Sequence, residues 1–175
     1  MPNLLILYKS KYGATKKYAA LLHEELPSQI MDIRQFTPSS LEGFGQIVLA
    51  GGIYAGGIAG LSLFKKHLPK FQGKRLAIFC VGASPYEESA IQELKKRHLK
   101  GSLSDVPLFY GRGAWNPDKM TFKDRTLCRL LAKSLTNTSP ENLEPWMKAL
   151  LEASGKTCDW VDPSYLAPLV AYLKS

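Results

Sequence analysis

Residues 10–15 of the chain read Ser-Lys-Tyr-Gly-Ala-Thr, and they follow an apolar run directly. Gly13 allows the backbone to turn tightly, and the hydroxyls of Ser10 and Thr15 can donate hydrogen bonds. Successive amides before a helix N-terminus attract anions. The segment therefore fits an anion site, although a strand-to-helix turn capped by a threonine fits it equally well. With Gly13 as its only glycine, it matches neither a Walker A motif nor a dinucleotide fingerprint.

Residues 51–60 form a second candidate loop, in which five of ten residues are glycine. Glycine lets the backbone approach a flat ligand closely and lets a peptide flip, for which Gly56 or Gly57 is the expected position. Tyr54 offers a ring that could stack on such a ligand. A flexible loop with a core tyrosine is the simpler alternative.

A third candidate loop, residues 82–86, reads Gly-Ala-Ser-Pro-Tyr. Its amides and the hydroxyl of Ser84 could bond the polar edge of a ring. Ser84 and Pro85 also suit a helix start, as cap and first helical residue, and both interpretations can hold together. Three such loops at three predicted strand ends are a stronger signal than any one of them.

The elements that must position these loops alternate between strand and helix. Five strands are predicted at 4–8, 29–33, 46–50, 75–81 and 107–110, and helices at 15–26, 61–68, 87–100, 121–135, 142–153 and 163–173. This alternation predicts an α/β fold, namely a doubly wound five-stranded parallel sheet with helices on both faces. The long stretch 111–159 is expected to be an insertion near the fifth strand of a single domain, residues 1–175.

Composition excludes several classes of protein. The chain has 175 residues, 45% of them hydrophobic, which suits one folded domain. Neither a membrane span nor a secretory signal is expected. Three widely spaced cysteines and three histidines in charged helical stretches suggest no disulfide framework and no metal site, which fits a cytoplasmic protein.

The formal net charge is +8, and the segment 95–133 holds ten basic residues against three acidic ones. The predicted helix 121–135 places Arg125, Arg129 and Lys133 in one stripe, while leucines 127, 130, 131 and 135 supply its apolar side. A surface helix with a solvated basic face is favoured. The alternative is a docking face for an anionic membrane or an acidic redox partner.

Residues 5–15, Leu-Ile-Leu-Tyr-Lys-Ser-Lys-Tyr-Gly-Ala-Thr, resemble the first strand and phosphate loop of flavodoxin-like proteins. The segments Phe109–Gly113 and Phe122–Arg125, with Asp159-Trp160 later, resemble menaquinone-dependent protoporphyrinogen dehydrogenases within that family. The resemblance implies FMN as cofactor and an insertion beside the flavin that brings Arg112, Trp115 and Lys119 near the site as substrate or acceptor residues. The implied cofactor-binding residues are Ser10, Lys11, Tyr12, Gly13, Ala14, Thr15, Ile53, Tyr54, Ala55, Gly56, Gly57, Gly82, Ala83, Ser84 and Tyr86.

Three functions follow as hypotheses. The first is an FMN-dependent oxidoreductase that passes electron pairs from a protoporphyrinogen-type substrate to a quinone or a partner protein, with peripheral membrane contact through helix 121–135. The second is a flavodoxin-type electron carrier, although typical carriers are acidic. Nucleic-acid binding ranks last, because no recognition motif or aromatic platform accompanies the basic stretch.

Overall fold

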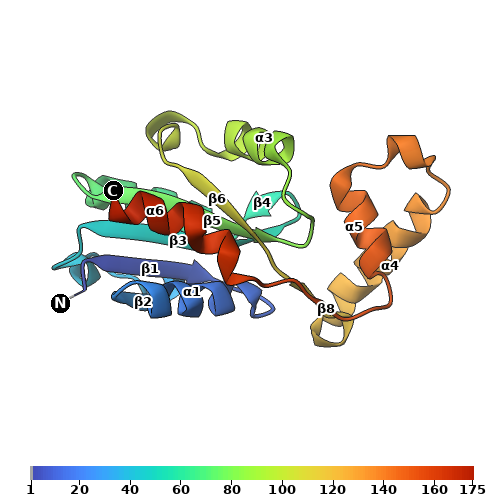
Figure 1. The fold of residues 1–175 in the computed structure, drawn as a ribbon, viewed down its shortest axis with the longest axis horizontal. Helices are drawn as coiled ribbons and strands as arrows, with labels where there is room; N and C mark the ends of the chain where they lie inside the picture. Colours follow the sequence, from blue (N-terminus) through green and yellow to red (C-terminus); the bar gives the residue numbers. More distant parts are fainter. Residues whose placement is uncertain (1) are drawn as a thin grey trace.

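The computed structural model describes residues 2–175 and has a twisted parallel sheet at its centre (Figure 1). Five strands run parallel in the order β2-β1-β3-β5-β6. The order reverses between β1 and β3, which makes the sheet doubly wound, as the sequence predicts. The strands are β1 (Leu4–Lys9), β2 (Ser28–Asp32), β3 (Gln46–Tyr54), β5 (Arg75–Gly82) and β6 (Leu108–Arg112).

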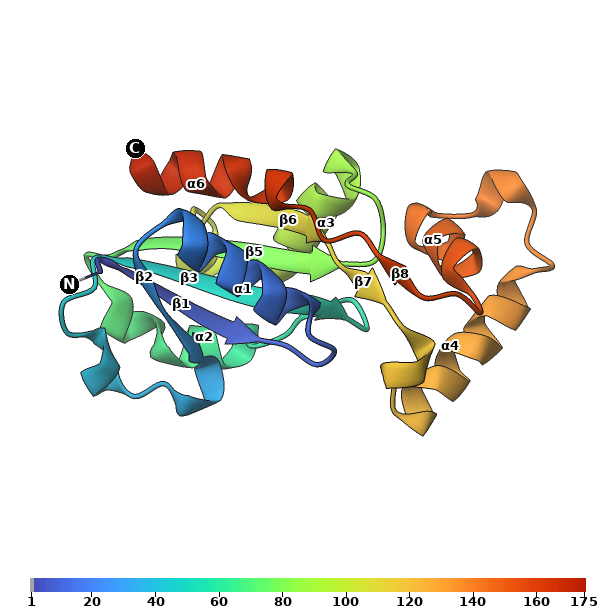
Figure 2. The same cartoon turned by 60° about the horizontal axis from the view of Figure 1, so that its bottom comes forward.

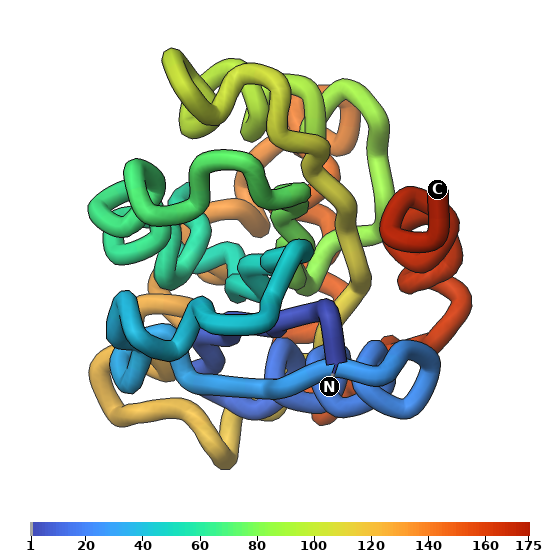
Figure 3. The backbone as a smooth tube through the Cα atoms, turned by 90° about the vertical axis from the view of Figure 1, so that its left-hand side faces the viewer, coloured from blue at the N-terminus to red at the C-terminus, as the bar shows by residue number. Residues whose placement is uncertain are grey.

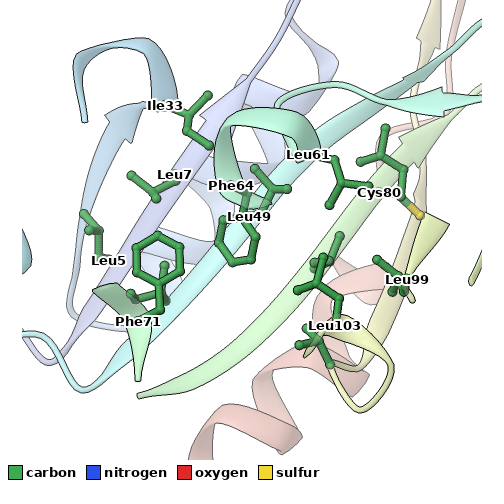
Figure 4. Close-up of a cluster of buried hydrophobic side chains, with 14 of the residues drawn as sticks. Leu5, Leu7, Ile33, Leu49, Leu61, Phe64, Phe71, Cys80, Leu99 and Leu103 are labelled. Atoms are coloured by element: carbon green, nitrogen blue, oxygen red, sulfur yellow. The ribbon is translucent and has the colours of Figure 1, made fainter. Parts of the chain in front are cut away.

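Burial on both faces explains why the central strands read as unbroken apolar runs. In β1, Leu5 and Leu7 enter one hydrophobic core, whereas Leu4 and Ile6 enter the other. Figure 4 shows the first of these cores, in which Phe64 and Phe71 pack beside the β1 and β3 leucines. Alternate side chains of a strand therefore pack into the cores on opposite faces of the sheet.

The predicted helices cover both faces of the sheet. Helices α1 (Ala14–Glu25) and α6 (Ala167–Lys174) line one core, and α2 (Leu61–His67) and α3 (Glu88–His98) line the other. Figure 2 shows α1 and α6 together on one face, and the end-on view of Figure 3 separates red α6 from green α2. Short 3-10 turns join several elements, at 33–35, 38–41, 68–71, 101–103, 117–119, 140–142 and 163–166.

The glycine-rich segment departs from the prediction. Strand β3 does not end at Ala50 but continues to Tyr54 and turns back as the short antiparallel strand β4 (Gly57–Ile58). Gly51 permits this fold-back, because a Cβ there would lie 2.3 Å from the Ala59 carbonyl oxygen. The predicted ten-residue loop is thus mostly a hairpin with a tight tip.

The insertion leaves β6 and returns to α6 through a narrow neck. Its two short strands, β7 (Ala114–Trp115) and β8 (Cys158–Asp159), pair antiparallel and carry helices α4 (Phe122–Leu135) and α5 (Pro145–Ala153) beyond the carboxyl ends of the sheet strands (Figures 1 and 2). Helix α5 starts at a proline, three residues later than predicted, because proline suits the first helical position.

Helix α4 turns an unexpected side toward the rest of the protein. Its buried residues are Asp124 and Ala132, whereas Leu127, Leu130 and Leu131 are 51%, 62% and 39% exposed. The leucines of α4 therefore face solvent, and the side chains of Lys123, Arg129 and Lys133 are exposed as well. No helix within residues 2–175 combines the length and apolarity needed to cross a bilayer.

Candidate functional site

The first predicted loop ends β1 and opens α1. Gly13 is the N-cap residue, with φ 99°, and its amide donates to the Ser10 hydroxyl at 3.1 Å. No side chain among residues 2–175 caps this helix, so the amides of its first turn stay open toward the sheet edge. Thr15 is buried, and a Cβ added to Gly52 would lie 3.4 Å from its hydroxyl oxygen. This is the geometry of an anion site at a helix N-terminus.

The second predicted loop is the tip of the β3–β4 hairpin. Ala55 and Gly56 both have positive φ, 47° and 75°, as a two-residue hairpin turn of type I′ requires. Gly57 lies in β4 and is not among the positive-φ glycines, so of the two expected flip positions only Gly56 has a conformation that glycine is needed for. The His98 ring nitrogen Nε2 lies 2.6 Å from the Gly56 carbonyl oxygen and ties the tip to the end of α3.

The third predicted loop follows β5 and is held by β6. Arg112 donates from Nε to the Ala83 carbonyl at 2.9 Å, and the Tyr110 hydroxyl donates to the Ser84 carbonyl. Helix α3 begins at Glu88 rather than at Pro85, so Ser84 and Pro85 remain in the loop and do not start the helix. The hydroxyl of Tyr86, which is half exposed, donates to Glu88.

A carboxylate from the insertion joins two of these loops. Asp124, 7% exposed, accepts hydrogen bonds from Lys11 Nζ at 2.5 Å and from the hydroxyls of Tyr12 and Tyr54. Lys11 first, then Tyr12 and Tyr54, hold the pKa of Asp124 well below its usual range. Asp124 in turn raises the pKa of Lys11. Lys11 Nζ also lies 4.3 Å from the centre of the Tyr54 ring, so one face of that ring already holds a cation.

Asp124 is the site residue that sequence reasoning missed. It lies 113 positions from Lys11, and no local pattern links the two residues. The one available signal was its place in the segment Phe122–Arg125, which carries the resemblance to a subfamily. The Tyr12 hydroxyl is directed to Asp124 rather than into the loop.

The three predicted substrate residues, Arg112, Trp115 and Lys119, lie in different surroundings. The Arg112 guanidinium holds the third loop and stacks on Trp160, with Cζ 3.9 Å from the ring centre. The Trp115 indole N–H is buried and has no hydrogen-bond partner within residues 2–175. Lys119 is exposed on the insertion. No hydrogen bond or ion pair joins these three side chains in the described part of the chain.

A groove of about 540 Å³ opens where the second and third loops approach the insertion. Its lining includes Gly56 of the hairpin tip, Ser84 and Pro85 of the third loop, residues of α3, and Trp146 of α5. None of residues 10–15 reaches it. A second hollow, of about 390 Å³, lies near Asn3, Arg75 and Ser175 and contains none of the predicted site residues. In residues 2–175 no cluster of three or more His, Cys, Asp or Glu side chains could hold a metal.

The sequence model of the flavodoxin domain matches residues 5–141. The chain belongs to this flavodoxin domain family. The match covers the sheet as far as β6, the three loops and α4, and the family implies a flavin cofactor. No curated protein matches the chain significantly.

Three solved structures are similar to this flavodoxin domain. A Trp repressor binding protein from Bacillus subtilis is 12% identical with a TM-score of 0.47, over 63% of this chain and 84% of that one. An archaeal flavodoxin is 15% identical with a TM-score of 0.42, over 86% and 98%. An azoreductase from Bacillus anthracis is 9% identical with a TM-score of 0.39, over 88% and 97%.

The residues of this flavodoxin domain fit a flavin on two observations. The open first turn of α1 suits a phosphate group, and glycine at position 13 supplies the left-handed conformation that such a loop needs. The buried, unpartnered indole N–H of Trp115 is a free donor close to the neck of the insertion. The predicted contact residues remain predictions, and the structure brings their loops to one edge of the sheet.

Proposed function

We propose that the chain is an FMN-dependent oxidoreductase, with one domain, residues 1–175, carrying both the flavin loops and the insertion. One observation carries the proposal: a phosphate-type loop, a hairpin tip and a third loop lie at the same edge of the sheet, with a groove beside them. The open α1 N-terminus favours FMN over riboflavin, because only FMN brings a phosphate to those amides. When bound, FMN would supply reversible storage of an electron pair.

The substrate in this proposal is a protoporphyrinogen-type tetrapyrrole and the acceptor is a quinone. For each electron pair transferred, the substrate loses two electrons and two protons, and the quinone gains both and becomes the quinol. Propionate groups on the substrate are anionic, and Lys119 and Lys123 are exposed cations on the insertion that would attract them. Arg112 contributes by holding the Ala83 carbonyl, which fixes the third loop beside the groove.

The groove gives a second aromatic molecule access to the flavin loops. Trp146 is 44% exposed there, and its indole N–H donates to Glu144 at 2.5 Å, which fixes the orientation of the ring. An aromatic surface of fixed orientation can stack on a planar ligand. A quinone ring held between Trp146 and the hairpin tip would lie beside the predicted flavin contacts at Gly56 and Ser84.

Absorption and turnover test the proposal. The protein incubated with FMN and desalted is expected to keep a flavin spectrum, and anaerobic mixing with protoporphyrinogen and a soluble naphthoquinone is expected to oxidise the first and reduce the second. Trp146→Leu should raise the KM for the naphthoquinone, with Phe122→Leu, an exposed aromatic of α4 that does not line the groove, as the matched control. Flavin binding without any turnover would favour the electron carrier, and absence of bound flavin would refute both functions.

The proposal also includes the location of the protein in the cell. We propose a cytoplasmic protein that contacts an anionic membrane peripherally through α4, where a lipid-soluble quinone resides. The exposed leucines of α4 and the exposed cations Lys123, Arg129 and Lys133 support this contact, because apolar side chains flanked by basic ones bind anionic interfaces. Arg125 takes no part in it, since its guanidinium donates to the Pro117, Asp118 and Met120 carbonyls.

A further inference from the structure

We propose that Asp124 is a positioning residue of the flavin site, which fastens the insertion to the two flavin loops and holds their aromatic side chains in place. The inference rests on the proposed function for the identity of the ligand, but its structural basis is independent of it. Three donors from two separate loops, Lys11, Tyr12 and Tyr54, converge on this single carboxylate.

The position of Asp124 on α4 is itself fixed. Thr121 is the N-cap residue of the helix, and its hydroxyl accepts from the Asp124 amide at 3.2 Å. One residue further, the Arg125 guanidinium binds the carbonyls of the preceding 3-10 turn and stiffens the start of α4. The carboxylate is therefore presented to the loops from a rigid helix end, which is a better support than a mobile loop.

The opposite side of α4 supplies no alternative attachment. Phe122 is 85% exposed and Leu130 is 62% exposed, so this side of the helix makes little contact with the protein. Removal of the Asp124 charge would leave the Lys11 ammonium without its partner and two phenols without their acceptor. Because Lys11 and Tyr54 are about half exposed, water can satisfy their polar groups, and what is lost is the link between α4 and the two loops. The insertion and both loops should loosen together.

The consequence for ligand binding distinguishes Asp124 from the phosphate loop. Tyr54 is predicted to contact the flavin ring, whereas Ser10 is predicted to contact the phosphate. Loss of the Asp124 contact should therefore weaken FMN and riboflavin alike, because both molecules carry the ring. Loss of the Ser10 hydroxyl should weaken FMN alone. This pattern separates positioning of the ring site from binding of the phosphate.

The experiment compares Asp124→Asn with Asp118→Asn, an exposed acid in the same insertion whose carboxylate makes no hydrogen bond in residues 2–175. Dissociation constants for FMN and for riboflavin are measured by flavin fluorescence. Hydrogen exchange of the segment 122–135 is measured separately on flavin-free protein. For Asp124→Asn we expect both dissociation constants to rise about tenfold or more, the effect of losing hydrogen bonds to a charged group, and exchange in α4 to accelerate. Asp118→Asn should change neither quantity.

A double-mutant cycle tests the direct link. Tyr54→Phe keeps the ring and removes only the hydroxyl that Asp124 accepts from. If the two groups act through one contact, the double variant Asp124→Asn/Tyr54→Phe weakens riboflavin by less than the product of the single effects. If Asp124→Asn alone lowers the overall stability, Tyr54→Phe by itself still tests the proposal, because it removes one donor to Asp124 and should also weaken riboflavin.

Several results would overturn the proposal: unchanged exchange of α4 in Asp124→Asn, unchanged flavin affinities despite faster exchange, or fully multiplicative effects in the cycle. Failure of the proposed function gives a different result. Wild-type protein that binds neither flavin would refute the flavin assignment, while the exchange rates of the flavin-free variants would still decide whether Asp124 fastens the insertion.

Discussion

The guanidinium of Arg112 stacks on the indole of Trp160, with Cζ 3.9 Å from the ring centre. Arg112 ends β6, where the chain leaves the sheet for the insertion, and Trp160 follows β8, where the chain returns. The same guanidinium holds the Ala83 carbonyl of the third loop. One side chain thus connects both ends of the insertion with a loop of the candidate site.

Arg112→Lys keeps the charge and removes the planar group. We expect the free energy of unfolding to fall by about 1–2 kcal/mol, because both the stacking and the hydrogen bond to Ala83 depend on the guanidinium. Urea unfolding measures this loss. The exposed Lys119→Gln is the control and should stay within about 0.5 kcal/mol of wild type. Equal stability of the two variants would contradict the role given to Arg112.

Ser10→Ala tests the phosphate loop. Its hydroxyl accepts from the Gly13 amide at 3.1 Å and is predicted to donate to the phosphate of FMN. We expect FMN binding to weaken by about 1–3 kcal/mol, the usual effect of losing a hydrogen bond to a charged group. Thr15→Ala should act in the same direction. Riboflavin affinity, measured by the same fluorescence titration, should hardly change, and an equal loss for both ligands would remove the phosphate from this loop.

Gly51→Ala tests the hairpin that replaces the predicted loop. The new Cβ would lie 2.3 Å from a backbone oxygen, so β4 must shift. We expect a loss of about 1–3 kcal/mol in the free energy of unfolding, as overpacking typically produces. Gly57→Ala is the matched control, since its nearest atom would be 3.6 Å away and its φ is not positive. Comparable losses at both positions would argue against the close approach.

The thiol of Cys80 should be unreactive toward thiol reagents in the native protein. Burial raises its pKa to about 12, so almost no thiolate exists at pH 8. Wild type and Cys80→Ala should therefore give the same number of reactive thiols with a disulfide reagent under native conditions. In denaturant the variant should give one fewer. Native labelling of Cys80 would show that the core around β5 opens on the labelling timescale.

Leu130→Ser and Lys133→Glu test the proposed membrane contact of α4. Both should reduce co-sedimentation with phosphatidylglycerol vesicles, the first by loss of apolar contact and the second by about fivefold or more at low salt through charge reversal. Phosphatidylcholine vesicles provide the comparison without surface charge. Wild-type protein that binds neither vesicle would refute the contact and leave the rest of the proposed function intact.

Local patterns in the sequence predicted the helices and strands of the sheet but not every turn between them. The apolar run at Leu4–Tyr8 predicted β1, and the first and third loops lie at the ends of β1 and β5, where the sequence placed them. The hairpin at Tyr54–Gly57 was not predicted, because glycine favours a loop and a fold-back equally.

Contacts between distant segments could not be predicted in this way. Asp124 meets Lys11 across 113 positions, and only the course of the insertion brings them together. The outward side of α4 was also unpredictable. Helical periodicity identifies an apolar side but assumes that this side is the buried one, and in α4 a carboxylate takes that place.

The position of the insertion also affects the order in which the protein can fold during synthesis. The core that α1 shares with α6 includes Leu169 and Val170, which the ribosome adds only after the entire insertion. Until then the growing chain exposes an apolar strip of the sheet that α6 will later cover. Nascent chains begin to fold from the N-terminus, so this strip is the surface that a chaperone would recognise on the unfinished protein.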